Sequence, residues 1–296
     1  MKDKLQDDSI STDDIAPKNS KDKKCAPHLS FSNGSCLPVE ILVDMANAYN
    51  SEFPNKKIKT FASLESLNPK KYKKILIKQF GERLKDVCDS QRCWVKQKFT
   101  SNMKKELHQY AKKHSFRPSG PSGKFTWLNT FNINEVMEQY ELKYKDFSFI
   151  GAVPIDFDDL PQLGIKDINL SDLMKNNKTK LGFVFNLDEH YKSGSHWVGM
   201  YSDLKQGEVL FFDSYGVEPD KRIRKLMRRI ARFCKDNSQS VNVKHNKVRH
   251  QYKNSECGVY SINFILRLLR GDTFEEITNN ITTDSDINRC RSVYFQ

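Results

Sequence analysis

The sequence predicts an α+β fold in which a helical N-terminal region precedes a core of strands and helices. Apolar residues recur at helical spacing through much of residues 28–117. Between residues 180 and 212, three short apolar runs are typical of strands, and the links between them contain Gly194 and Gly207. Such links favour hairpins, so we expect core strands that pair with their sequence neighbours.

The composition is that of a folded protein with a basic surface. The 296 residues are 38% hydrophobic and 11% aromatic, enough for one substantial core with an accessory domain or for two small domains. The formal net charge of +12 makes nucleic acid a conceivable partner, although a lysine-rich surface also serves solubility. The sequence contains no recognisable nucleic-acid-binding module, which disfavours nucleic-acid binding as the main function.

The cysteines and the N-terminus indicate a reducing compartment. The seven cysteines are an odd number, and the first residues contain no apolar segment of the kind found in secretory signals. We therefore expect thiols in a cytoplasmic protein, and the lack of a long apolar run predicts no membrane insertion. Cys88 and Cys93 could form half of a zinc site with Cys36 or His108. No second Cys/His pair has a suitable spacing, so neither a metal nor a cofactor is expected.

Residues 1–27 are expected to be a disordered tail, because Lys, Asp and Ser dominate them and large apolar groups are nearly absent. Residues 28–117 are expected to form a basic arm domain of amphipathic helices. One helix follows Pro38, a second includes residues 72–87 and a third residues 103–111. The lysines on the outer faces are either solvated or in contact with a substrate or nucleic acid. The most clustered are Lys70, Lys71, Lys73 and Lys74.

A cluster of Pro, Gly and Ser over residues 114–124 marks the domain boundary. The core is therefore expected to span residues 118–296. Its first element is an amphipathic helix, for which Asn132 or Asn134 can provide the N-terminal cap.

Two features of the core bear on a possible groove. Trp127 and Leu128, directly before the first core helix, either anchor it or line a substrate groove. Asn186 ends the first expected strand and either forms a turn or faces the cleft. The expected strands are residues 180–187, 196–201 and 208–212. A helix over residues 221–234, whose basic face is either solvated or binds an acidic partner, and a last strand near residues 241–248 follow.

Cys257 lies where a helix should begin. From this residue onward, apolar side chains recur at spacings of three and four until Gly271 stops the pattern. The first turn of a helix has unpaired N–H groups and the positive end of the helix dipole, which stabilise a thiolate relative to a thiol. Most free cysteines are small buried apolar residues, so a catalytic role for Cys257 needs support from other residues.

Three other residues could complete a thiol-dependent catalytic site. His196 opens one expected strand and Asp213 closes the next, so a hairpin would bring both to the same end of the sheet. The carboxylate could then accept from one imidazole nitrogen and leave the other facing Cys257. Gln251, six residues before Cys257, offers an amide donor for a developing oxyanion, and the Cys257 backbone N–H offers a second.

These residues carry a family resemblance. The motifs are His196-Trp197, Asp213-Ser214, and Gln251 followed after five residues by Cys257-Gly258-Val259-Tyr260. Their order and spacing resemble those of the ubiquitin-like-protein (SUMO-specific) proteases and adenain. Within that class, the chain is most similar to the polyprotein-processing proteases of large cytoplasmic DNA viruses, the African swine fever virus and mimivirus types. The resemblance covers residues 125–296. It implies a papain-like or adenain-like core, with a central mixed sheet flanked by helices.

The resemblance implies a role for each residue of the site. Cys257 would be the nucleophile, and His196 would be its general base. Asp213 would orient the imidazole, and Gln251 would donate to the oxyanion. Several viral relatives have Asn as the third member, where this chain offers Asp213.

Further residues are implied to contact the substrate. Trp197 would cover a narrow channel that admits only glycine at the cleavage site. Trp127 and Asn186 are the other candidates for the substrate groove. Thr130 stands where cellular SUMO proteases tend to have an acidic residue.

The expected activity is that of a cysteine endopeptidase with a protein substrate. It would mature viral structural polyproteins after Gly-Gly-type sites, in the cytoplasmic viral factory and in the virion. One alternative is an isopeptidase that removes ubiquitin or a ubiquitin-like protein from conjugates. Another is a basic scaffold that binds nucleic acid on a protease fold. DNA is also a conceivable activator, since the related adenain uses it as a cofactor.

Overall fold

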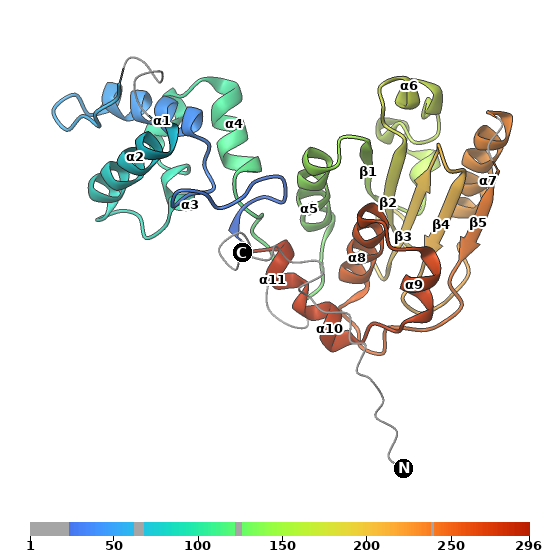
Figure 1. Cartoon of the computed structure of the whole chain (residues 1–296). Helices are drawn as coiled ribbons and strands as arrows, with labels where there is room; N and C mark the ends of the chain where they lie inside the picture. The colour runs from blue at the N-terminus through green and yellow to red at the C-terminus, as the bar shows by residue number, and fades with distance from the viewer. Residues whose placement is uncertain (1–23, 62–67, 122–125, 238–239) are drawn as a thin grey trace, which may run out of the picture. The chain divides into compact units, whose positions relative to one another are not determined.

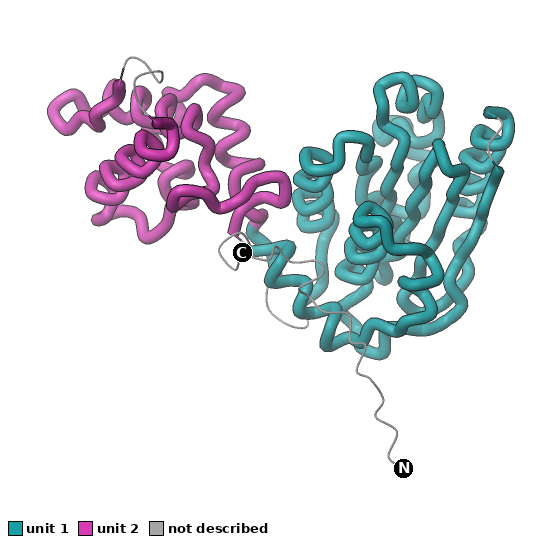
Figure 2. Tube along the Cα trace, in the orientation of Figure 1, with its two compact units in different colours: residues 1–17, 119–296 teal, residues 18–118 magenta. Residues whose placement is uncertain are grey.

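The computed structural model describes residues 24–61, 68–121, 126–237 and 240–296. The chain divides into two compact units (Figure 2). The first along the chain covers residues 18–118 and is unit 2 in the key of the figure, and the second takes in residues 119–296 and is unit 1 in the key. Most of the expected tail, residues 1–27, lies outside the described residues. Two residues near the end of this range differ from the predicted disorder: Cys25 and Ala26 are fully buried within the first unit.

The first unit is helical and has its own apolar core. Its helices are α1 (Val39–Glu52), α2 (Pro69–Leu84), α3 (Gln91–Trp94) and α4 (Lys105–His114), with a 3-10 helix at Lys98–Asn102. Asn68 caps α2 by accepting from the Lys70 N–H, and Pro69 occupies the first turn, where a missing N–H is harmless. The three helices predicted for this region correspond to α1, α2 and α4.

Lys73 is separate from the exposed lysines of α2. Its side chain is buried, and Nζ donates to the Ser35 carbonyl at 3.0 Å and to the Ser32 hydroxyl at 3.3 Å. Burial lowers the pKa of this amine, against the opposing influence of Glu40. Both alternatives for Lys73, a solvated side chain and a contact with substrate or nucleic acid, are therefore wrong, because this residue holds the segment that leads into α1.

Four cysteines of the first unit form two disulfides, Cys25–Cys36 and Cys88–Cys93. The expectation of thiols is wrong for these four, because sequence spacing does not show which cysteines the fold brings together. The zinc alternative at Cys88 and Cys93 fails as well, since a zinc ligand must be a thiolate. The free cysteines, all buried, are Cys234, Cys257 and Cys290.

The second unit is organised around a mixed sheet whose described strands lie in the order β1-β2-β3-β4-β5 (Figure 1). They are β1 (Phe147–Pro154), β2 (Lys180–Asn186), β3 (Trp197–Asp203), β4 (Glu208–Phe212) and β5 (Asn242–His245). β1 runs parallel to β2, and β5 runs parallel to β4. The β2–β3 and β3–β4 pairs are antiparallel, which confirms both predicted hairpins. The sequence did not predict β1.

Helices cover both faces of the sheet (Figure 1). Two of them, α5 (Thr130–Lys143) and α8 (Cys257–Arg270), share one apolar cluster with the sheet. The predicted basic helix, α7 (Lys221–Asp236), packs on the other face. Consecutive strand residues point to opposite faces, so Phe212 joins the α5 and α8 cluster while Phe211 joins that of α7.

Helix α5 begins earlier than predicted. Asn129 is its cap: the Asn129 side chain accepts from the Asn132 N–H at 2.9 Å, and the Asn132 side chain accepts from the Asn129 N–H at 3.1 Å. Asn132 thus completes a capping box, while Asn134 accepts from a backbone N–H of β1. The prediction of Asn132 or Asn134 as the cap is therefore wrong. Thr130 and Phe131, in the first turn, are exposed, so the apolar periodicity that indicated the start of the helix begins only after them.

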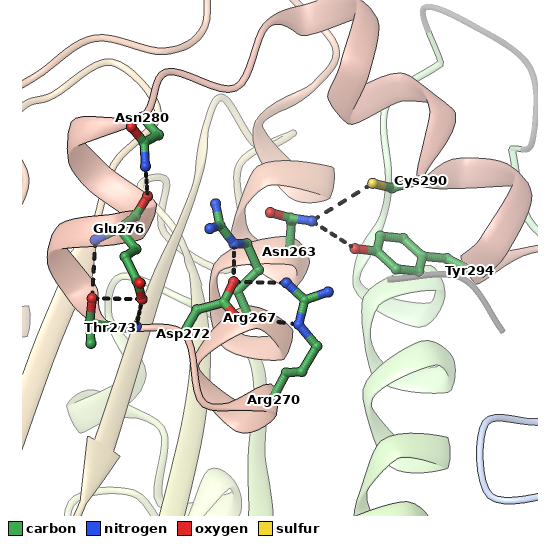
Figure 3. A network of polar contacts seen from close by, with 9 residues as sticks. All are labelled: Asn263, Arg267, Arg270, Asp272, Thr273, Glu276, Asn280, Cys290 and Tyr294. Carbon is green, nitrogen blue, oxygen red and sulfur yellow. Dashed lines mark hydrogen bonds and ion pairs between the residues drawn. The ribbon is translucent and has the colours of Figure 1, made fainter. Parts of the chain in front are cut away.

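Helix α8 ends at Gly271, as predicted, with a φ of 107° that glycine adopts readily. Directly beyond it, the Asp272 carboxylate accepts from Arg267 Nε at 2.6 Å and from Arg270 Nη2 at 2.8 Å (Figure 3). Thr273 and Glu276 then form a capping box that starts the next helix. Short helices complete the unit: α9 (Phe274–Asn279), α10 (Asp284–Arg289) and α11 (Arg291–Tyr294), with α6 (Leu170–Lys175) between β1 and β2.

Helix α11 is attached to α8 by polar contacts inside the core. The Asn263 side chain donates to the Cys290 sulfur at 3.7 Å and to the Tyr294 hydroxyl at 3.4 Å (Figure 3). Both partners are buried, so the C-terminal helices are part of the core and not an appendage. Across the described ranges, no helix has the length and apolarity needed to span a membrane.

Candidate active site

Cys257 is the first residue of α8, and only 4% of its surface is exposed. The Glu256 side chain does not cap the helix, so the N–H groups of the first turn are left for another acceptor. A Cβ on Gly258 would lie 3.1 Å from the Leu128 Cβ. Glycine therefore lets the segment before α5 lie against the start of α8.

His196 and Asp213 meet at the same end of the β3–β4 hairpin. The register pairs Gly199 with Phe212, which brings the residue before β3 close to the residue after β4. His196 Nε2 lies 2.6 Å from Asp213 Oδ1, and both side chains are buried. The sequence-based expectation that a hairpin would bring these two residues together therefore agrees with the geometry.

The surroundings of His196 favour the imidazolium. Burial alone would lower the pKa, but hydrogen bonds to Asp213 and Cys257 and their negative charges raise the pKa of His196 to about 9. Because Asp213 occupies Nε2, Nδ1 is the ring nitrogen left for Cys257. An imidazolium beside a cysteine at a helix N-terminus is the arrangement that cysteine proteases use to hold a thiolate.

Two residues that the sequence analysis missed support this pair. Asn246 accepts from the Asp213 N–H at 2.8 Å and donates to the Asp213 carbonyl at 2.7 Å, which fixes the backbone on both sides of the carboxylate. Tyr215 stacks on the His196 ring, with centroids 4.4 Å apart and planes inclined by 14°. Its N–H also donates to Asp213 Oδ1 at 2.8 Å. The nearness of Tyr215 to Asp213 in sequence was the only available signal.

Gln251 is completely buried in the loop before α8. Its Oε1 accepts from the Ser214 hydroxyl at 2.7 Å, and its Nε2 donates to the Lys253 carbonyl at 2.7 Å. The Gln251 N–H donates to the Ser214 carbonyl at 2.9 Å. The amide is therefore fixed against the residue that follows Asp213, and one Nε2 hydrogen is left for another acceptor.

The two candidate tryptophans have different environments. Trp197 is buried, and its indole N–H donates to the Leu128 carbonyl at 2.9 Å. Leu128 is buried as well, whereas 48% of Trp127 is exposed. The sequence left open whether Trp127 and Leu128 anchor the first core helix or line a groove. Leu128 anchors the core, whereas Trp127 remains on the surface.

Cavities lie on both sides of Trp127. One, of about 340 Å³, is also lined by Trp197 and Asn186. The other, of about 510 Å³, is lined by Trp127 and residues 252–255 of the loop before Cys257. Asn186 Oδ1 also accepts from the Asp188 N–H at 3.0 Å, so this residue both shapes a turn and lines the cleft.

The arrangement supplies the groups needed for acyl transfer through a thioester. The imidazole is hydrogen-bonded to the Asp213 carboxylate and is influenced by the nearby Cys257 sulfur, and backbone N–H groups are available at the start of α8. In the part of the chain that the structure describes, no cluster of three or more His, Cys, Asp or Glu side chains is placed to hold a metal ion.

Comparison with known proteins identifies relatives in sequence. A family model described as the Ulp1 protease family, C-terminal catalytic domain, matches residues 173–295. A protein of Acanthamoeba polyphaga mimivirus, named as a thiol protease, is 38% identical over 280 residues, which are 92% of this chain and 93% of the relative. A cysteine protease of African swine fever virus is 22% identical over 233 residues, which are 71% of this chain and 83% of the relative.

A solved structure has the same fold. The crystal structure of an African swine fever virus protease superimposes with a TM-score of 0.65 at 19% sequence identity. The match covers 95% of this chain and 97% of the other. At this level of identity, the likeness concerns the fold.

Proposed function

Because the chain belongs to the Ulp1 protease family and is a cysteine protease, we propose that Cys257 is its nucleophile and His196 its general base. In this proposal Asp213 orients the imidazole, and Gln251 and the Cys257 N–H stabilise the oxyanion. The observation that supports these roles most directly is the 2.6 Å hydrogen bond between His196 Nε2 and Asp213, on an imidazole that also contacts Cys257.

The proposed reaction begins from a thiolate and an imidazolium. The Cys257 sulfur attacks the carbonyl carbon of the scissile bond, and the charge that develops on the carbonyl oxygen is stabilised by the two N–H donors. The C–N bond then breaks as His196 gives its proton to the leaving amine, which leaves a thioester. Water attacks the thioester while His196 takes a water proton, and the acid product leaves the regenerated thiolate.

The proposed cleavage site follows a Gly-Gly sequence. Trp197 is fixed against Leu128, Leu128 in turn packs against Gly258, and Trp127 stands at the edge of both cavities. A cleft closed in by these side chains favours substrate residues without a side chain. The relatives named as proteases in large DNA viruses support viral structural polyproteins as substrates, processed in the cytoplasmic viral factory or in the virion.

Cleavage of defined peptides tests the proposal. We expect the purified chain to cut blocked peptides after Gly-Gly, and Cys257→Ala to lower kcat by at least about four powers of ten. Cys234→Ala is the matched control, because Cys234 is also a buried free cysteine but belongs to α7, on the opposite face of the sheet. Equal activity of the wild-type protein and Cys257→Ala would exclude Cys257 as the nucleophile.

The same assay separates endopeptidase from isopeptidase activity. A set of substrates should include Gly-Gly peptides from viral structural precursors and a ubiquitin-like protein with a fluorescent group on its C-terminus. We expect faster cleavage of the precursor peptides. Faster cleavage of the ubiquitin-like reporter would instead assign the enzyme to removal of ubiquitin-like proteins from conjugates.

DNA is proposed as an activator that binds the basic face of α7. Acidic neighbours pair with part of this face, as in the 3.2 Å ion pair of Arg222 with Asp159. Arg228 and Arg232 lie further along the helix and are exposed. We expect DNA to raise the cleavage rate at low salt and to lose its effect at high salt, because phosphate contacts weaken as salt rises. A rate that does not respond to DNA at low salt would exclude this role.

A further inference from the structure

The loop before the proposed nucleophile has no regular secondary structure of its own. This nucleophile loop, residues 251–256, connects the region after β5 to Cys257. Gln251, Ser255 and Glu256 are buried within it. Buried backbone groups in a loop need partners from elsewhere in the fold, because a strand or helix ladder does not satisfy them. In the nucleophile loop, α10 and α11 provide such partners for the N–H groups of Tyr252 and Lys253 and for the Ser255 carbonyl.

Asp284, the first residue of α10, holds the first half of the loop. It is buried, and its Oδ2 accepts from the Tyr252 N–H at 2.9 Å and from the Lys253 N–H at 3.0 Å. Its Oδ1 accepts from the Tyr260 hydroxyl, on the first turn of α8, at 3.2 Å. One carboxylate therefore joins the residues next to Gln251 to the helix that begins at Cys257.

Glu256, directly before the proposed nucleophile, is completely buried and is held from α10. Its carboxylate accepts from the Ser255 N–H and hydroxyl, each at 2.9 Å. It also accepts from the Asn288 side chain at 2.8 Å. A buried charge needs such contacts, since desolvation is costly and only hydrogen bonds and an opposite charge offset it.

Arg291, the first residue of α11, provides that opposite charge. Its side chain is completely buried. Nη2 donates to the Ser255 carbonyl at 2.9 Å, and Nε donates to Asn288 Oδ1 at 2.8 Å. Burial lowers the pKa of this guanidinium, while the negative charges of Glu256 and Cys257 favour its protonated form. Arg291 thus secures the second half of the nucleophile loop.

We propose that Asp284 and Arg291 are positioning residues for catalysis, which hold the nucleophile loop so that the Cys257 thiol and N–H and the Gln251 amide are aligned for attack. The inference rests on the proposed function in one respect, that Cys257 is the nucleophile. Neither residue lines the two cavities beside Trp127, so neither is expected to contribute to substrate binding. Their effect is therefore on the reacting geometry and not on affinity.

Asp284→Asn is the first test, because it keeps the shape of the side chain and weakens its two backbone contacts. Asp286→Asn is the matched control: Asp286 lies on the same helix and pairs with Arg289 at 3.1 Å, away from the nucleophile loop. We expect kcat of Asp284→Asn on a Gly-Gly peptide to fall about 10- to 100-fold, with KM changed by less than about twofold, as misplacement of reacting groups predicts. Asp286→Asn should match the wild-type protein.

Arg291→Lys is the second test, since a single amine cannot reproduce the three bonds that the guanidinium makes to Asn288, Ser255 and Pro121. Circular dichroism melts establish that each variant is folded at the assay temperature. A folded Asp284→Asn protein with wild-type kcat, or with a raised KM and unchanged kcat, overturns the positioning role. Cys257→Ala is assayed in parallel: activity there overturns the proposed function, whereas an inactive Cys257→Ala beside a normal Asp284→Asn overturns only the present inference.

Discussion

His196 is buried between two groups that favour its protonated form, the Asp213 carboxylate and the Cys257 sulfur. Burial opposes protonation, yet the pKa of the imidazole is raised to about 9. At neutral pH the ring therefore already carries the proton that a leaving amine requires. The stacked Tyr215 ring holds the imidazole in place, and the hydrogen bonds of Asn246 hold the backbone of Asp213.

Asp213→Asn tests the orienting role. An amide cannot supply the negative charge that helps to raise the pKa of His196, and it can present the wrong hydrogen-bonding group to Nε2. We expect kcat/KM to fall by about two to four powers of ten. The alkaline limb of the pH profile, expected near the pKa of about 9 in the wild-type protein, should move to lower pH. A profile identical in shape to that of the wild-type protein would contradict this role.

The same pKa makes stability depend on pH. In the folded state the pKa of His196 is raised from 6.5 to about 9, so the folded protein binds this proton more tightly than the unfolded chain. The resulting stabilisation is complete below pH 6.5 and is lost as the pH rises through about 9. Urea unfolding at several pH values should show this decline, and His196→Gln should remove it. His190→Gln is the control, because 53% of the His190 side chain is exposed; an equal effect there would point to another titrating group.

At the level of elements, the segment before α5 and the loop before α8 enclose the cleft together. Trp127 lines both cavities, while its neighbour Leu128 is buried against Gly258 and Trp197. The exposed indole of Trp127 contributes little to the packing of the core. Its removal should therefore affect substrate contacts more than folding.

Trp127→Ala is expected to raise KM for Gly-Gly peptides about 10-fold, the loss expected for about 1.4 kcal/mol of aromatic contact, with a small effect on the melting temperature. Phe131→Ala is the matched control, since Phe131 is 77% exposed on the first turn of α5 but does not line either cavity. If KM changes in both variants, or in neither, Trp127 is not a specific contact for the substrate.

The elements that local sequence patterns specify were predicted well. Strands β2, β3 and β4 have short apolar runs between glycine-containing links, and α7 and α8 have strong helical periodicity. The contact between His196 and Asp213 followed from the hairpin alone. Asn246 and Asp284 could not be found in this way, because each lies far along the chain from its partner: Asn246 lies 33 residues from Asp213, and Asp284 lies 32 residues from Tyr252. A buried polar residue has no local signature until the fold shows what it contacts.

At the level of the whole molecule, the two units are stabilised differently. The second unit has a sheet covered by helices on both faces, whereas the first has a smaller helical core and two disulfides. A small helical unit buries less apolar surface per residue, so cross-links contribute more of its stability. Cysteine spacing alone predicts thiols here and does not reveal this dependence.

Replacing Cys25 and Cys36 with serine tests that dependence. The disulfide joins residues 11 apart in sequence, so its loss should lower the free energy of unfolding of the first unit by about 2–3 kcal/mol. Urea unfolding of chains that also carry Trp127→Phe and Trp197→Phe, so that Trp94 in the first unit is their remaining tryptophan, measures the change by fluorescence. The wild-type protein treated with a reducing agent should lose at least as much stability as the double variant. If the urea midpoint of the first unit changes neither in the double variant nor in the reduced wild-type protein, the cross-link does not stabilise this unit.

The contacts of α10 and α11 with the nucleophile loop also bear on protein synthesis. Ribosomes make chains from the N-terminus, and domains fold as units as they emerge. Cys257 is translated before Asp284 and Arg291, so in a growing chain the thiol follows a loop that still lacks its carboxylate and guanidinium partners. If these two residues position the loop as proposed, a chain still being translated cleaves more slowly than the complete fold. Full cleavage activity then appears only after α10 and α11 have left the ribosome.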